Sequence, residues 1–164
     1  MQERAIGVVS RDVLVAEAGL SFLRGLIDGR HPAPPFSQTT GAYLVEAEPN
    51  RVVFRGTPSA AFLNPLGTIH GGWTSAILDS AMACAVHTTL EPGQGYTTVE
   101  MKLNFVRPIT PDVGEVTCEG VVVHRGGTLA TSEGKLFDAQ GRLLAHGSET
   151  CMIFAASALA TKAA

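Results

Sequence analysis

The fold is organised around the stretch Asn64-Pro-Leu-Gly-Thr-Ile-His-Gly-Gly-Trp-Thr-Ser-Ala-Ile-Leu-Asp-Ser-Ala-Met-Ala-Cys-Ala-Val-His87. Its first residues form a loop, because Pro65, Gly67 and the pair Gly71-Gly72 each break regular structure. Residues 73–89 contain no Gly or Pro and are rich in Ala, which predicts a helix. Nearly all of them are apolar or small, so we expect this helix to be buried on most sides.

The glycine pair before this helix is suited to bind a carbonyl oxygen. The first N–H groups of a helix have no partner within it, and the helix dipole favours negative charge beside them. Because Gly71 and Gly72 lack a Cβ, a ligand can approach their amides closely. The alternative is a tight turn that only allows close helix–sheet packing. We favour an oxyanion site at one or both amides.

A single carboxylate, Asp79, lies in the middle of the apolar helix. A buried acid costs free energy unless it is paired or hydrogen bonded, so its presence needs a reason. Asp79 is either a polar group bonded to a core hydroxyl or loop, or the base that acyl transfer requires. Spacing alone leaves both readings open, and no second acid is evident.

The spacing of these two features indicates a site shared by two chains. Gly72 and Asp79 are seven residues apart, so they lie on nearly the same helix face. They are nevertheless about 10 Å apart along the axis, too far for Asp79 to reach a carbonyl held at its own glycines. A second copy running antiparallel would bring its Asp79 over the first copy's glycines. We therefore expect a homodimer.

The order of these residues resembles a known family signature. Asn64, His70, Gly71, Gly72 and Asp79 fit the pattern Asn-x5-His-Gly-Gly-x6-Asp, which is similar to that of hotdog-fold acyl-CoA thioesterases. The PaaI-like group, named for phenylacetate degradation, is the most similar. This resemblance implies an α+β hotdog fold, in which a long antiparallel sheet is wrapped around one central helix.

The flanking segments extend the likeness over roughly residues 38–156, through residues 96–108 and 141–147. Alternation and turn chemistry predict strands at residues 41–48, 51–56, 96–105, 114–124, 128–137 and 142–154. Residues 11–29 have helical spacing, with a break near Gly19, and residues 30–35 form a connector. We divide the chain into an N-terminal helical extension and linker (1–37), a hotdog domain (38–156) and a flexible tail (157–164).

The resemblance also implies roles for single residues. It favours Gly71 over Gly72 as the N–H donor to the thioester carbonyl. Asn64 would hold the attacking water or orient its loop near Asp79. A hydroxyl near that water would come from Thr98 or, less closely matched, Thr97, although both threonines also suit a plain strand.

Three further positions keep two interpretations each. His70 either contacts the thioester or fixes the loop through the backbone. The turn at Arg125 resembles the place where this family meets the nucleotide part of coenzyme A, but a solvated charge is the default reading. Met82 is either core or part of the acyl pocket, and spacing does not separate the two.

Composition excludes several other classes of function. The net charge of −3, with acids and bases interspersed, gives no support for a nucleic-acid or anionic-membrane partner. No apolar run approaches a membrane span, and no signal-peptide core follows Met1, so we expect a cytoplasmic protein. The three cysteines, Cys84, Cys118 and Cys151, read as buried thiols, and no metal motif exists. We expect no metal and no cofactor besides the coenzyme A of the substrate.

Together these features predict a hydrolase that cleaves an acyl- or aroyl-CoA thioester to the free acid and CoA. Asp79 of the facing subunit would act as base or nucleophile, and the resemblance implies that two dimers pair as a homotetramer. One alternative is a non-catalytic acyl-CoA binding or sensor protein, which would keep the pocket without needing Asp79. The other is a hotdog hydratase, whose characteristic motif is not seen here.

Overall fold

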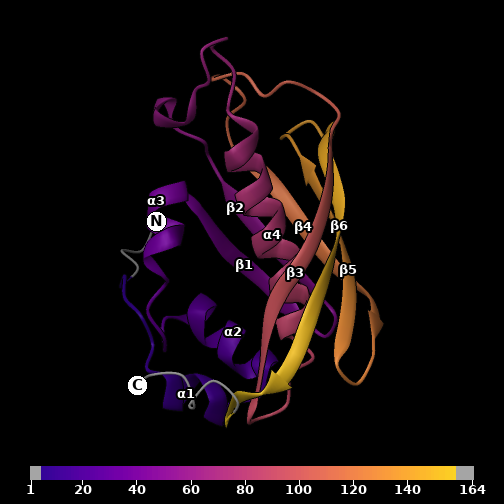
Figure 1. Cartoon of the computed structure of the whole chain (residues 1–164). Coiled ribbons are helices and arrows are strands. Elements are labelled where there is room, and N and C mark those ends of the chain that lie inside the picture. The colour runs from indigo at the N-terminus through magenta and orange to yellow at the C-terminus, as the bar shows by residue number, and fades with distance from the viewer. Residues whose placement is uncertain (1–4, 158–164) are drawn as a thin grey trace.

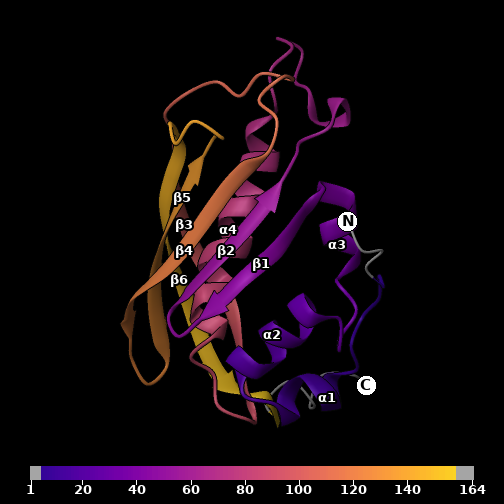
Figure 2. The same cartoon turned by 180° about the vertical axis from the view of Figure 1, so that it is seen from behind.

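The computed structural model describes residues 5–157, in which six antiparallel strands form one sheet in the order β1-β2-β4-β5-β6-β3. A helix, α4 (Gly71–His87), lies in the curve of this sheet (Figures 1 and 2). The predicted arrangement of a long antiparallel sheet around one central helix is therefore confirmed. The strands are β1 (Ala42–Glu48), β2 (Arg51–Gly56), β3 (Gln94–Phe105), β4 (Val116–Arg125), β5 (Leu129–Phe137) and β6 (Leu143–Ala155).

Two glycines allow α4 to lie directly on the sheet. Gly120 of β4 and Gly134 of β5 are register partners. A Cβ on Gly120 would overlap the carbonyl oxygen of Ala81, and one on Gly134 would come within 2.8 Å of Met82 Cγ. Met82 is fully buried at this contact, which places it in the core between helix and sheet. The helix that was predicted to be buried from its small residues therefore packs closely against glycines of the sheet, which have no side chain.

The start of α4 differs from the prediction. The helix was expected over residues 73–89, after the glycine pair, but it begins at Gly71 and ends at His87. The reason is the cap, because His70 Nδ1 accepts a hydrogen bond from the Gly72 N–H at 2.8 Å. Such a cap stabilises the first turn and offsets the low helix propensity of glycine. Both glycines therefore belong to the helix.

The N-terminal segment forms three short helices, of which the second and third lie beside β1 and the first lies below the second in Figure 2. The predicted break near Gly19 separates α1 (Arg11–Ala16) from α2 (Gly19–Asp28). The third helix, α3 (Pro35–Thr40), was not predicted, because its prolines were read as a connector. Proline suits the first turn of a helix, and Gly41, with φ 70°, ends it. This helix crosses residue 38, where the hotdog domain was expected to begin.

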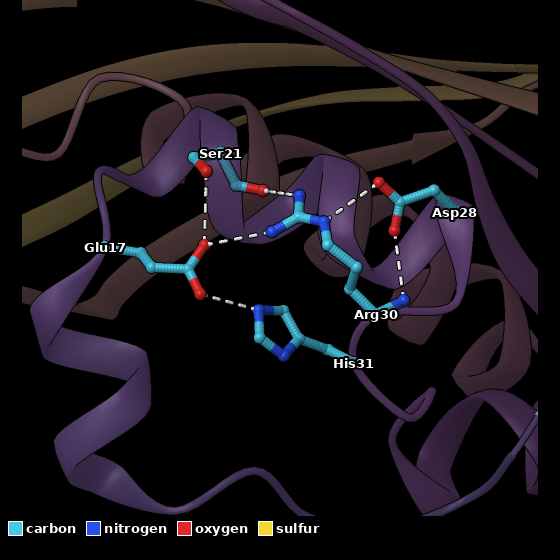
Figure 3. Close-up of polar contacts among 5 residues, drawn as sticks. All are labelled: Glu17, Ser21, Asp28, Arg30 and His31. Carbon is cyan, nitrogen blue, oxygen red and sulfur yellow. Dashed lines mark hydrogen bonds and ion pairs between the residues drawn. The ribbon is translucent and has the colours of Figure 1, made fainter.

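Polar contacts join parts of this extension to one another, and aromatic contacts hold it against α4 and β3. Glu17 accepts hydrogen bonds from Ser21 and His31, and Arg30 pairs with both Glu17 and Asp28 (Figure 3). These groups are mostly exposed, so we assign them little stability. Beneath them, the rings of His31, Phe22, His87 and Tyr96 follow one another at centroid separations of 4.9, 5.5 and 5.2 Å. Burial lowers the pKa of His87 to about 4, so this ring is neutral near pH 7.

Parts of the predicted termini lie outside the described residues, namely residues 1–4 of the extension and residues 158–164 of the tail. Among residues 5–157, none of the helices has both the length and the apolar character needed to cross a membrane.

Candidate active site

Asp79 lies at the wall of an apolar cavity of about 200 Å³. The carboxylate projects from the middle of α4 and is partly exposed. The other walls come from the N-terminal extension and from strands β1 to β3, through Leu26, Pro34, Phe36, Leu44, Phe54 and Tyr96. The N-terminal extension, in which the sequence showed no chemistry, therefore forms part of the space that Asp79 faces.

Thr98 is the hydroxyl that meets Asp79. Its Oγ1 lies 3.1 Å from Asp79 Oδ1, within hydrogen-bond distance. The register of β3 against β6 shifts between Thr98 and Glu100, so Val99 forms a bulge directly after this residue. Thr97 is exposed, and its hydroxyl only approaches the Thr98 carbonyl at 3.5 Å. Of the two predicted threonines, the structure brings Thr98 to the carboxylate and leaves Thr97 away from it.

A second carboxylate, Glu149 of β6, lies in the same cluster and was missed from the sequence. Its Oε1 is 2.9 Å from Thr98 Oγ1 and 3.1 Å from the Cys151 thiol. Only 1% of the residue is exposed. Burial, and after it the neighbouring Asp79, raise the pKa of Glu149 to about 7. The expectation that Asp79 has no acidic partner was therefore wrong.

The sequence did contain a signal for this residue. In β6, Ala145, Gly147, Glu149, Cys151 and Ile153 alternate with more exposed residues and all face the core. A carboxylate in such an apolar row needs a reason as much as Asp79 does.

The glycine end of α4 offers a free backbone donor. Gly72 donates its N–H to His70, whereas no hydrogen-bond acceptor for the Gly71 N–H is found within residues 5–157. Gly71 lines a separate cavity of about 210 Å³, together with Phe105 and Arg107. Because His70 Nδ1 is the acceptor in the cap, the neutral ring carries its proton on Nε2. His70 thus contacts the backbone, as expected for a residue that fixes the loop, and the rest of its ring is exposed.

The two cavities share no lining residue. Gly71 and Asp79 therefore do not face the same space within one chain. The helix separates them by eight residues, or about 12 Å along its axis.

Two other candidates are occupied by contacts inside the chain. Asn64 closes its own turn, with Nδ2 donating to Thr68 Oγ1 at 2.9 Å and Oδ1 accepting from the Leu66 N–H at 2.9 Å. Arg125 donates to Thr89 Oγ1 at 3.1 Å and to Gln94 Oε1 at 3.3 Å. The structure thus brings neither residue to Asp79 or Gly71 of its own chain.

The cysteines near the site are unsuited to act as nucleophiles. Cys84 lines the Asp79 cavity, but burial and then Asp79 raise its pKa to about 12. Burial also raises the pKa of Cys118 and of Cys151, and all three are free thiols. Among residues 5–157, no three His, Cys, Asp or Glu side chains gather as metal ligands would. The cluster thus combines two carboxyl groups, Asp79 and Glu149, with the Thr98 hydroxyl, and Asp79 faces an apolar cavity.

Comparison with known proteins agrees with this chemistry. The family model of the thioesterase superfamily matches residues 66–145, which include Gly71, Asp79 and Thr98. Acyl-coenzyme A thioesterase 13 of Homo sapiens is 31% identical over 131 residues, covering 78% of this chain and 91% of that protein.

Solved structures show the same fold. A phenylacetic acid degradation-related protein of Ralstonia eutropha has a TM-score of 0.73 at 28% identity, covering 80% of this chain and 98% of that chain. A mutant of the phenylacetic acid degradation protein PaaI from Thermus thermophilus has a TM-score of 0.65 at 27% identity, covering 72% and 97%. The chain therefore belongs to the thioesterase superfamily, as a hotdog-fold, PaaI-like thioester hydrolase.

Proposed function

We propose that this protein hydrolyses acyl-CoA thioesters at a site formed by two copies of the chain. In this site the Gly71 N–H of one subunit polarises the thioester carbonyl, and Asp79 of the other subunit acts on it. The observation that carries the proposal is that Gly71 and Asp79 open into different cavities of one chain. A free helix-terminal N–H and a half-buried carboxylate act on one carbonyl only when a second α4 lies antiparallel to the first.

The edge of the sheet supports this pairing. Strand β3 is one of the two edge strands, so it has only one hydrogen-bonded neighbour, β6, within residues 5–157. Exposed apolar side chains lie on it, with Val99 52% and Phe105 57% exposed. Pairing of two β3 strands about a two-fold axis would cover these side chains and set the Asp79 clusters beside the partner's α4.

A second contact is proposed on the outer face of the sheet, where two dimers would join. Large apolar side chains remain exposed on neighbouring strands there, including Val121 and Val123 of β4, Leu129 of β5 and Met152 of β6. Leu129 and Met152 are register partners, so they form one surface.

The chemical step needs only groups that the site would contain. A water oxygen adds to the thioester carbon as its proton passes to the Asp79 carboxylate, and the negative charge on the carbonyl oxygen is held by the Gly71 N–H. The C–S bond then breaks and CoA leaves as a thiolate, which needs no strong general acid. Alternatively, the Asp79 oxygen itself attacks and forms an anhydride, which water cleaves afterwards.

The cavity beside Asp79 favours a compact acyl group. At about 200 Å³ it is apolar and bounded by Phe36, Phe54 and Tyr96. An apolar cavity of about 150 Å³ accommodates a benzene ring, so a single ring with a short linker fits. The relatives named above carry acyl-coenzyme A and phenylacetic acid in their names, and we propose arylacetyl- or aroyl-CoA as the preferred class.

The coenzyme A phosphates require cations. Arg107 is exposed and lines the cavity that contains Gly71, with one donor, Nη1, bonded to the Leu143 carbonyl, whereas Nε and both Nη atoms of Arg125 donate inside the chain. We therefore propose Arg107 as a phosphate contact.

The test is release of CoA thiol from a panel of acyl-CoAs, from acetyl to palmitoyl with phenylacetyl and hydroxybenzoyl members. Wild type, Asp79→Asn and the control Glu133→Gln, which alters an exposed carboxylate of β5, are compared. We expect kcat to fall by about 10²- to 10⁴-fold in Asp79→Asn and to stay unchanged in the control. Wild-type turnover in Asp79→Asn would refute the proposed mechanism. Tight binding without turnover in wild type would instead indicate an acyl-CoA binding protein.

A further inference from the structure

Near the middle of α4, the carboxyl groups of Asp79 and Glu149 lie around the Thr98 hydroxyl without a cation. Thr98 Oγ1 lies 3.1 Å from Asp79 Oδ1 and 2.9 Å from Glu149 Oε1. Within residues 5–157, none of the ion pairs includes Asp79 or Glu149. The Glu149 Oε2 is buried and lacks any hydrogen-bond partner there. The proposed thioester hydrolysis does not require this second carboxyl group.

The hydrogen count of this cluster limits its charge. A threonine hydroxyl has one proton, so it can donate to only one of the two carboxyl groups. The other short O···O contact is a hydrogen bond only if that carboxyl carries a proton and donates it to Thr98 Oγ1. Two ionised carboxylates around one hydroxyl would repel each other in a site with little solvent. One of the two is therefore neutral.

Burial identifies Glu149 as the neutral one. Glu149 is 1% exposed and half of its carboxyl group has no partner, whereas Asp79 is partly exposed at the cavity wall. An unpaired carbonyl oxygen costs less to bury than an unpaired charge. Burial and the neighbouring Asp79 raise the pKa of Glu149 to about 7, against the lowering effect of its hydrogen bonds with Cys151 and Thr98.

The other groups around the cluster bring no positive charge. Cys151 of β6 donates its thiol proton to Glu149 Oε1 at 3.1 Å. Ser132 of β5 is the register partner of Glu149, and its buried hydroxyl also has no partner within the described chain. Burial raises the pKa of Cys84 and of Tyr96, so both are neutral near pH 7.

We propose that Glu149 is a positioning residue that, in its protonated form, donates to Thr98 Oγ1 and thereby directs the Thr98 proton to Asp79 Oδ1. This inference rests on the proposed function, in which Asp79 acts on the thioester. The chain Glu149–Thr98–Asp79 keeps Asp79 ionised, fixes its orientation and leaves its second oxygen free for water or the substrate. Ionisation of Glu149 would break this chain, because Thr98 would then stand between two anions.

The kinetic test compares Glu149→Gln with Glu149→Leu over pH 5.5 to 9. Gln mimics the neutral acid and keeps a donor for Thr98, whereas Leu has none. We expect wild-type kcat to fall as the pH rises through about 7, and this fall to be absent in Glu149→Gln. We also expect Glu149→Gln to keep at least tenfold more kcat than Glu149→Leu, with similar KM values. Equal kcat losses in both variants, or a wild-type profile without the fall, would overturn the proposal.

A spectroscopic measurement separates this inference from the proposed function. In protein labelled with ¹³C at glutamate carboxyl groups, the Glu149 signal is identified by its loss in Glu149→Gln. We expect its titration midpoint near 7 and at lower pH in Asp79→Asn, which removes the neighbouring charge. A midpoint near the ordinary glutamate value, in an enzyme that still depends on Asp79 for turnover, would refute the role of Glu149 and leave the proposed function intact.

Discussion

The two halves of the proposed site are built in different ways by the same helix. At the start of α4, a short loop, the His70 cap and the free Gly71 N–H all come from neighbouring residues. In the middle of α4, Asp79 meets Thr98, 19 residues away, and Thr98 meets Glu149, a further 51 residues away. The first half is a local motif, whereas the second exists only once β3 and β6 have paired. Each half can therefore be broken separately.

The largest expected effect comes from two separate variants, each of which disables one half of the proposed site. Gly71→Pro removes the N–H at the first helical position, where proline is well tolerated and His70 is already extended, with ψ 137°. Loss of one oxyanion donor lowers kcat by about 10²- to 10³-fold. Asp79→Asn disables the other half.

Mixing the two inactive variants tests whether the halves come from different subunits. After unfolding and refolding together, half of the dimers would contain one chain of each kind. Each mixed dimer has one intact site, made of Gly71 from the Asp79→Asn chain and Asp79 from the Gly71→Pro chain. We expect recovery of about a quarter of wild-type activity. No recovery, although native mass spectrometry shows mixed dimers, would mean that one chain supplies both halves.

The second prediction concerns the stability of the buried half. The pKa of Glu149 is about 7 in the folded chain, against an ordinary glutamate value of 4.5. An acid with a raised folded pKa binds its proton more tightly in the folded state, so stability is lost as the pH rises from 4.5 through 7. The loss attributable to this residue is about 3 kcal/mol at pH 8.

Urea unfolding at pH 5 and pH 8 measures this loss. Wild type should lose about 2 to 3 kcal/mol more of its unfolding free energy between these pH values than Glu149→Gln does, because a small part of the loss has already occurred by pH 5. Glu133→Gln, at an exposed carboxylate, should behave as wild type. An identical pH dependence in wild type and Glu149→Gln would show that Glu149 titrates at its ordinary value when folded.

The same contrast explains what the sequence could predict. The loop, the helix and the six strands were predictable, because periodicity and turn residues are local. No predicted strand end differs from the observed one by more than two residues. The helix α3 was missed, since its prolines fit both a connector and a first turn. Glu149 was missed because its partners are set by the pairing of β3, β5 and β6, which spacing alone does not fix. Asn64 illustrates the reverse case, in which a residue of the motif makes contacts only within its own turn.

The smallest expected effect separates Arg125, where the resemblance places the nucleotide part of coenzyme A, from Arg107, which the structure places at the Gly71 cavity. Arg107 lies at the cavity of the local half, beside Gly71, whereas Arg125 joins β4 to Thr89 and Gln94 near the opposite end of α4. If Arg107 binds a phosphate of coenzyme A, Arg107→Ala should raise KM for acyl-CoA about tenfold, the equivalent of 1.4 kcal/mol, with little change in kcat. The KM effect should vanish with an acyl-pantetheine substrate, which lacks the nucleotide.

Arg125→Ala should leave KM unchanged and lower the unfolding free energy by about 1 kcal/mol, since it removes only internal hydrogen bonds. The opposite result, a KM effect at Arg125 alone, would place the nucleotide at the far end of the helix and would move the entry of the substrate away from the Gly71 cavity.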